Sequence, residues 1–279
     1  MRTLLSYWSF DIISISFIVL LCLLYGYIIR FKWHKQSVYF FTGIALLIVC
    51  VASPLHYLGE HYLFSAHMLT HTLLLLMVAP LLIAGIPKEN KLKNTFIFFS
   101  KKISRYPFLC WLMGVGVMWL WHVPAIYNQL FVVHSAMAMP SIHHMNVLSY
   151  IHMLSLLIAG MVFCLPVINP YSAYRLTPLF GVLYLTSACI GCSLLGLFIT
   201  FAPAGTYTHY ISMSESNNIL SLIRNNWHIS AAADQQAGGL IMWVPCCFIY
   251  LSAAMLLLLK WFDAKEEAPS ISHAVPILE

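Results

Sequence analysis

Two histidines stand four residues apart inside a long apolar stretch of the sequence, Tyr62 to Pro87. On a helix, His67 and His71 lie on the same face, because residues i and i+4 are neighbours there. A polar pair is costly inside a segment long enough to span a bilayer, unless it has partners or a function. Neutral imidazole is the commonest protein ligand of zinc, copper and iron. The pair therefore predicts a metal site or a proton relay that side chains from other helices complete.

The composition indicates a polytopic membrane protein. Of the 279 residues, 61% are hydrophobic and only 8% are charged, and the mean hydropathy is +0.83. The apolar residues form runs of about 20, which is the length that crosses a bilayer as a helix. The net charge of +5 comes from loops beside these runs, so a lipid bilayer is expected as partner and nucleic acid is not. No nucleophile with a base, phosphate loop or dinucleotide motif is evident, so no catalysis is predicted.

Seven apolar runs predict an all-α bundle of seven transmembrane helices in one domain, residues 1–279. Twelve of the 14 Lys and Arg residues flank these runs on the same predicted side. The positive-inside rule then places the N-terminus outside and the C-terminus in the cytoplasm. Residues 88–105 are expected to form a basic loop, and Pro80 is expected to kink the third span. The expected spans are 12–29, 38–56, 62–86, 107–124, 149–166, 178–201 and 237–262.

With this topology, the histidines of four spans fall in the outer half of the membrane. Depth follows from the helical rise of about 1.5 Å per residue. The inner halves of the same spans contain no histidine. A shared depth predicts a site for copper or zinc, or for a haem held between helices. The candidate ligands are His67, His71 and His122, with His56 or His152.

Asp234 lies just before the seventh expected span and has two interpretations. As a helix cap, its carboxylate would accept hydrogen bonds from free backbone N–H groups at the start of that span. As a partner of the metal site, it would accept a hydrogen bond from a ligand histidine and orient its ring. The two roles are compatible.

The segment between the fourth and fifth spans combines imidazole with thioether side chains. Mixed nitrogen and sulfur ligands favour Cu(I), and this segment would face the outside, where copper arrives. Methionine is also a common apolar filler, so packing is an alternative. The candidates for outer-loop metal capture are His134, Met137, Met139, His143, His144 and Met145.

Four cysteines lie inside the sixth and seventh spans. Cys189 and Cys192 are surrounded by small residues, which favours close helix packing over redox or metal chemistry. Cys246 and Cys247 are adjacent and face different directions on a helix. The latter two are therefore not expected to bind one ion together.

Three motifs together resemble one family. They are H-M-L-T-H-T-L-L-L-L-M-V-A-P-L-L-I-A-G-I-P (67–87), W-H-V-P-A-I-Y (121–127) and A-D-Q-Q-A-G-G-L-I-M-W (233–243). They are similar in sequence and order to the polytopic CtaG family, assembly factors for caa(3)-type cytochrome c oxidase. The resemblance implies a multi-pass protein of the bacterial plasma membrane that serves respiratory chain biogenesis and plausibly delivers copper. The partners would be oxidase subunits or another copper chaperone. The residues that match its motif positions are His67, His71, His122, His152 and Asp234.

Two other functions remain open from the residues. One is a haem-binding electron-transfer protein, with His67 or His71 opposite His122 or His152 as axial ligands. The other is a zinc-dependent membrane hydrolase, in which three histidines and Asp234 hold the metal. Bound metal and an absorption spectrum would distinguish these functions from copper delivery.

Overall fold

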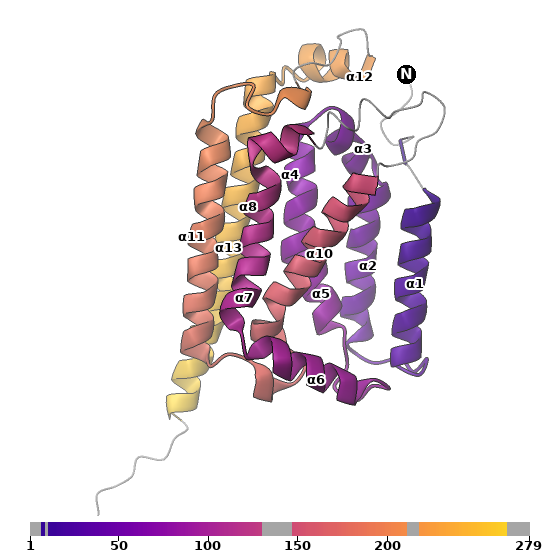
Figure 1. Cartoon of the computed structure of the whole chain (residues 1–279), viewed down its shortest axis with the longest axis vertical. Coiled ribbons are helices and arrows are strands. Elements are labelled where there is room, and N and C mark those ends of the chain that lie inside the picture. Colours follow the sequence, from indigo (N-terminus) through magenta and orange to yellow (C-terminus); the bar gives the residue numbers. More distant parts are fainter. Residues whose placement is uncertain (1–6, 9–10, 130–146, 211–217, 267–279) are drawn as a thin grey trace, which may run out of the picture.

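Every regular element is a helix in the part of the chain that the computed structural model describes, residues 7–8, 11–129, 147–210 and 218–266 (Figure 1). The all-α prediction is confirmed. The sixth expected span matches α11 (Pro178–Phe201) at both ends, and the fifth is extended slightly as α10 (Val147–Ile168). The first expected span is α1 (Ile12–Ile28).

Four helices are long and apolar enough to cross a membrane, which fits a membrane protein. They are Phe64–Ala84, α10, α11 and Ala231–Asp263. Two pairs of bent helices raise the number to as many as six, and α1, with 17 residues, is shorter than these. Seven spans and the orientation of the termini stay predictions.

The second expected span is broken near its end. The helix α2 (Ser37–Ala52) ends before Ser53, and α3 (Pro54–His61) continues at an angle of 41°. Ser53 accepts a hydrogen bond from the backbone N–H of Leu55, and Pro54 takes the first helical position, where its missing N–H costs nothing. The expectation of one helix over 38–56 is therefore wrong at Ser53, which places His56 on α3.

The third expected span runs without interruption from Phe64 to Ala84. It consists of α4 (Phe64–Leu73), a π-helical turn (Leu74–Val78) and α5 (Ala79–Ala84). Pro80 lies just after the π-helical turn. Proline cannot donate a backbone hydrogen bond, so the α-helical hydrogen-bond pattern is interrupted at Pro80. The wider π-helical turn lies directly before this interruption.

The expected loop over 88–105 is wrong in its second half, which forms the helix α6 (Lys93–Ser104). This helix runs across one end of the bundle in Figure 1 and meets the next span at 92°. It carries Lys101 and Lys102 together with the exposed rings of Phe98 and Phe99. Such a mixture is typical of a helix that lies along a membrane surface. The fourth span follows as α7 (Pro107–Trp111), a π-helical turn (Leu112–Gly116) and α8 (Val117–His122).

The last span begins earlier than expected, with α13 (Ala231–Glu266) in place of 237–262. The hydroxyl oxygen of Ser230 accepts a hydrogen bond from the backbone N–H of Ala233, so Ser230 caps this helix. Asp234 lies inside the first turn and not before it. The preceding polar segment contains a short helix, α12 (Asn218–Ser221).

The helices α11 and α13 form the most extensive packing pair, and α13 also packs against α4 (Figure 1). The helix α10 runs obliquely through the middle of the view and packs on α5. A continuous apolar core lies between these helices. It includes Met68, Met118, Leu156, Leu195 and Met242.

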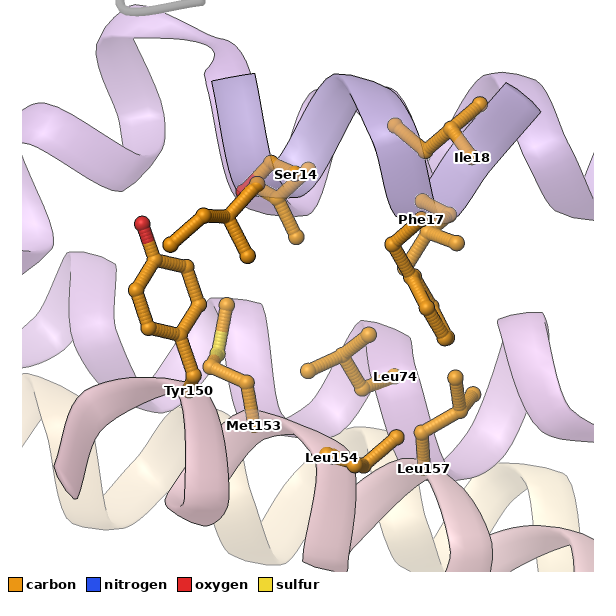
Figure 2. Close-up of a pocket in the computed structure, with 11 residues that line it drawn as sticks. Ser14, Phe17, Ile18, Leu74, Tyr150, Met153, Leu154 and Leu157 are labelled. Carbon is orange, nitrogen blue, oxygen red and sulfur yellow. The ribbon is translucent and has the colours of Figure 1, made fainter. Parts of the chain in front are cut away.

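The opposite side of the bundle holds an apolar pocket between α1 and α10. Figure 2 shows Phe17 and Ile18 of α1 facing Met153 and Leu157 of α10 across it. At one end, the hydroxyl of Tyr150 donates a hydrogen bond of 2.7 Å to the carboxylate of Asp11. This bond ties the start of α1 to α10. The pocket is lined mainly by apolar side chains and lies apart from the histidines.

Candidate metal centre

The carboxylate of Asp234 fixes the start of the helix that carries His67 and His71. One oxygen accepts a hydrogen bond of 2.7 Å from the backbone N–H of Phe64, and the other accepts one of 3.1 Å from that of Ser65. These are free donors in the first turn of α4, so Asp234 caps α4 from the neighbouring helix α13. The expectation that it caps its own span is wrong, because Ser230 holds that place. Asp234 positions the histidine helix as a whole.

Three histidines from two helices bring their ligand atoms together. One ring nitrogen from each of His67, His71 and His152 lies within 4.8 Å of the other two. The centroids of the His67 and His71 rings are 4.3 Å apart, as the i, i+4 spacing predicts, and His152 of α10 lies 4.6 Å from His71. His71 and His152 are buried at 1% and 2% exposure. Among the described residues, this is the one group of three potential ligands within such a distance.

His122 contacts this group through His71 and is itself held by the backbone of α8. Its Nδ1 lies 2.6 Å from the carbonyl oxygen of Met118, four residues earlier. A carbonyl can only accept, so Nδ1 carries the proton and Nε2 carries a lone pair. That Nε2 lies 3.3 Å from Nδ1 of His71, which therefore donates to it. The remaining nitrogen of His71, Nε2, is left with a free lone pair, which is the form that binds a metal.

Among the buried side-chain nitrogens that have no hydrogen-bond partner in the described part of the chain are two from the group of three histidines. They are Nε2 of His71 and Nε2 of His152. A buried polar atom without a partner costs roughly 1–3 kcal/mol, so native proteins rarely leave one in a core without a reason. Both atoms belong to the group of three histidines, and a bound ion would satisfy them together. The donor set therefore fits a metal.

The main chain at His152 is tied to its neighbours by a short hydrogen-bonded chain. The indole N–H of Trp121 donates a bond of 2.8 Å to the hydroxyl of Ser155, which donates one of 2.7 Å to the carbonyl oxygen of His152. The Trp121 ring also packs on the His152 ring, with centroids 4.6 Å apart. These contacts connect α8 to α10 and restrict the imidazole of His152.

His56 lies near the group but pairs with a carboxylate. Its Nε2 is 3.3 Å from Oε2 of Glu60, one turn later on α3. The structure therefore brings His67, His71 and His152 together, adds His122 beside His71, and holds His56 at Glu60. The predicted outer-loop residues His134, Met137, Met139, His143, His144 and Met145 lie outside the described residues.

Aromatic side chains pack beside His67 and His122 at one end of the site. Tyr127 is fully buried with its ring 5.5 Å from that of His67, and its hydroxyl lies 3.1 Å from the hydroxyl of Tyr210. Tyr207 donates a hydrogen bond of 3.0 Å to the carbonyl oxygen of His122 and stacks on Phe64. The sequence reasoning missed these residues. Tyr127 ends the W-H-V-P-A-I-Y motif, and its place in this motif could have identified it as a site residue. The sequence around Tyr207 and Tyr210 contains no comparable motif.

Met68 is another residue that the sequence reasoning missed. Its thioether sulfur lies 3.2 Å from Nε2 of His122, and its side chain is fully buried. It stands three residues before His71, so it falls on the same side of α4. A methionine between two histidines on one helix was the signal, but methionine is common enough as filler to hide it. The site thus combines imidazoles with one nearby thioether.

Comparison with known protein families matches residues 23–264 to a family described as cytochrome c oxidase caa3 assembly factor (Caa3_CtaG). The chain belongs to this family. The resemblance seen in the three motifs is thereby confirmed, and all helices of the metal centre lie within the matched residues. An assembly factor has a non-catalytic role, as the sequence predicted. No curated protein and no solved structure matches the chain.

Proposed function

We propose that this assembly factor binds copper through His67, His71 and His152 and delivers it to cytochrome c oxidase during assembly. The observation that carries the proposal is the convergence of three imidazoles within 4.8 Å, two of them with buried nitrogens that lack partners. Family membership supplies the oxidase as the recipient. The partners are oxidase subunits or another copper chaperone, and the location is the plasma membrane of a bacterium.

Copper is favoured by the atoms around the three histidines. Imidazole binds both copper and zinc, but a thioether is a soft ligand that selects Cu(I). Met68 places such a sulfur 3.2 Å from His122, next to His71. The fully buried Met118 belongs to the same apolar core. A soft monovalent ion is also the metal ion that costs least to hold in an apolar environment, because its charge is smallest.

A haem fits this arrangement less well than a single ion. Two axial histidines must face each other across the plane of the macrocycle. Here the rings of His67, His71 and His152 pack directly on one another, with centroid distances of 4.3 to 5.6 Å. The space between these rings can hold a single ion but not the macrocycle of a haem.

A zinc hydrolase built on Asp234 is also less well supported. Both oxygens of that carboxylate accept hydrogen bonds at the start of α4, and Glu60, the other nearby acid, lies beside His56. The carboxylate expected to help hold the metal is therefore engaged in capping. Zinc held by three histidines alone remains a distinct outcome of a metal titration.

The proposal is tested by the copper content of the oxidase in cells. Strains whose only copy of the chain carries His71→Ala or His152→Ala should assemble an oxidase that lacks most of its copper. His228→Asn is the matched control, because His228 is exposed and has a φ of 53° that asparagine tolerates. Normal oxidase copper in both site variants, with the chain present in the membrane at wild-type amounts, would refute the proposal.

A further inference from the structure

The four cysteines of the sixth and seventh spans meet as two pairs at the interface of α11 and α13. Sγ of Cys189 lies 3.5 Å from Sγ of Cys247. Cys192 is in side-chain hydrogen-bond contact with Cys246. The sequence reasoning considered the cysteines of each helix separately, and adjacent cysteines on α13 do face different ways. Each of them therefore meets a different cysteine of α11.

Glycines bring the two helices close enough for these pairs to form. A Cβ atom on Gly196 of α11 would lie 2.6 Å from Cβ of Trp243 and 2.9 Å from the carbonyl oxygen of Gly239. Gly196 lies one turn from Cys192 and two turns from Cys189 on α11. Trp243 lies one turn from Cys247 on α13, so this close approach of the two helices lies within two turns of both thiol pairs. The geometry of the pairs is thus fixed by the most extensive helix interface of the bundle.

Hydroxyl groups accompany both pairs of thiols. The Ser193 hydroxyl lies 3.1 Å from Sγ of Cys247, and Tyr250 is in hydrogen-bond contact with Cys192. Close packing needs only small side chains here, and alanine would serve as well as cysteine. Sulfur facing sulfur from two helices, with a hydroxyl beside each pair, goes beyond what packing requires. Hydroxyl groups can donate hydrogen bonds to a thiolate and stabilise its charge.

The arrangement in pairs indicates which metal it would take. Zinc in a structural site is held by four ligands around one point. In the described part of the chain, the three histidines form a group of three or more ligands that could hold one metal ion, and the four cysteines do not. Cu(I) is soft, prefers thiolate, and is held by two opposed sulfur atoms. Two sulfur atoms on opposite sides of one ion lie roughly 4.5 Å apart, at about 2.3 Å for each metal–sulfur bond. The sulfur atoms of Cys189 and Cys247 are in contact at 3.5 Å, so the two side chains must separate by about 1 Å to admit the ion.

We infer that Cys189 and Cys247 form a second metal site of this protein, which binds one Cu(I) ion as a bis-thiolate midway along α11 and α13. Binding forms two Cu–S bonds and releases the two thiol protons, so the site gains one negative charge and no electron is transferred. The Ser193 hydroxyl donates a hydrogen bond of 2.7 Å to the carbonyl oxygen of Cys189 and lies 3.1 Å from the Cys247 sulfur. It turns to donate to that sulfur when the thiolate forms and stabilises its charge. The site stands on its own residues and does not depend on the histidine centre.

The site is tested by Cu(I) titration of the purified full-length chain in detergent, without oxygen, against a chromophoric Cu(I) chelator. The variant Cys189→Ser/Cys247→Ser should bind one Cu(I) ion fewer per chain than the wild type. The control Cys50→Ser/Cys164→Ser removes two buried cysteines of α2 and α10 and should bind as much as the wild type. His71→Ala should retain the ion that the cysteine variant loses, so failure of either site is seen separately.

A measurement without cysteine variants guards against misfolding. X-ray absorption at the copper edge of His71→Ala, loaded with one Cu(I) ion, should show sulfur neighbours at a distance typical of a thiolate. The inference is overturned if the cysteine variant binds as many ions as the wild type, or if the absorption spectrum shows no sulfur. It is also overturned if thiol counting finds Cys189 and Cys247 joined in a disulfide, or if replacing Cys192 and Cys246 removes the ion instead.

Discussion

The protonation of His71 is set two hydrogen bonds away, at the carbonyl oxygen of Met118. That carbonyl holds the proton on Nδ1 of His122, whose Nε2 then accepts from Nδ1 of His71. Nε2 of His71 is thereby kept unprotonated and ready for a metal. If His71 binds copper as proposed, His122 is a positioning residue for that ligand, whereas its depth predicted that His122 is itself a ligand.

This chain of bonds predicts that His71 and His122 differ in their effect on copper affinity. Replacing His71 by Ala removes a ligand and should abolish binding at the histidine centre. Replacing His122 by Ala should weaken binding by about 10–100-fold, since partners of metal ligands typically contribute that much. Competition titration with a Cu(I) chelator measures both. Equal losses in the two variants would show that His122 is itself a ligand.

The cap that Asp234 provides to α4 predicts that the protein loses stability when this carboxylate is removed. Asp234→Ala leaves the N–H groups of Phe64 and Ser65 without their acceptor, and loss of a helix cap costs about 0.5–2 kcal/mol. Asp234→Asn keeps one acceptor oxygen and should lose less. The midpoint of thermal unfolding in detergent ranks the variants. If Asp234→Ala unfolded at the wild-type temperature, the capping role would be refuted.

The sequence alone predicted that His67 and His71 share one helix face, but it did not predict the aromatic and methionine side chains around them. The spacing of His67 and His71 defines their shared face at once, whatever the tertiary structure. Whether His152 meets them, and His56 does not, depends on the rotation of α10 and α3 about their axes, which depth does not determine. The pairing of His56 with Glu60 is visible as an i, i+4 spacing in the sequence, but nothing there ranks it above metal binding.

At the scale of elements, helix boundaries depend on local bonds that hydropathy does not record. The apolar run over 38–56 contains a break because Ser53 and Pro54 provide a cap and a first helical residue. The basic segment after Pro87 forms a helix because its aromatic residues can lie on a membrane surface while its lysines face water. The ends of α11 were predictable because Pro178 and the apolar run mark them directly.

The interface of α11 and α13 predicts a sharp difference between glycines. A side chain at Gly239 would meet the hydroxyl and backbone nitrogen of Thr200, whereas one at Gly116 would meet only the flexible end of Leu112, at 3.4 Å. Gly239→Ala should therefore destabilise the protein by about 1–3 kcal/mol through overpacking. Gly116→Ala is the control and should leave the unfolding midpoint nearly unchanged. Similar midpoints for both variants would contradict the close approach of these helices.

At the scale of the whole molecule, the topology decides which side of the membrane supplies and receives the metal. The loop charges predict an external N-terminus and a cytoplasmic C-terminus, with the histidine centre toward the outside. Figure 1 places α3, the start of α4 and the end of α8 at the same end of the bundle, opposite α6. This predicted orientation would place the basic helix α6 beside the cytoplasmic leaflet, which is anionic and attracts lysine side chains.

Reporter fusions test this orientation. Green fluorescent protein fused after Glu279 should fluoresce, since it folds in the cytoplasm, and alkaline phosphatase fused there should be inactive. Phosphatase inserted at position 205, between α11 and α12, should be active. The opposite pattern would place the histidine centre toward the cytoplasm and would contradict delivery of copper from the outer side.

The most direct test of the central claim is the copper environment at the histidine centre. X-ray absorption at the copper edge, on Cys189→Ser/Cys247→Ser protein loaded with one Cu(I) ion, isolates this centre from the thiol pair. Ligation by the histidines should give the multiple scattering of imidazole rings, which should disappear together with the bound copper in a protein that also carries His71→Ala. Copper that is not retained by the cysteine variant, or that shows no imidazole, would contradict it.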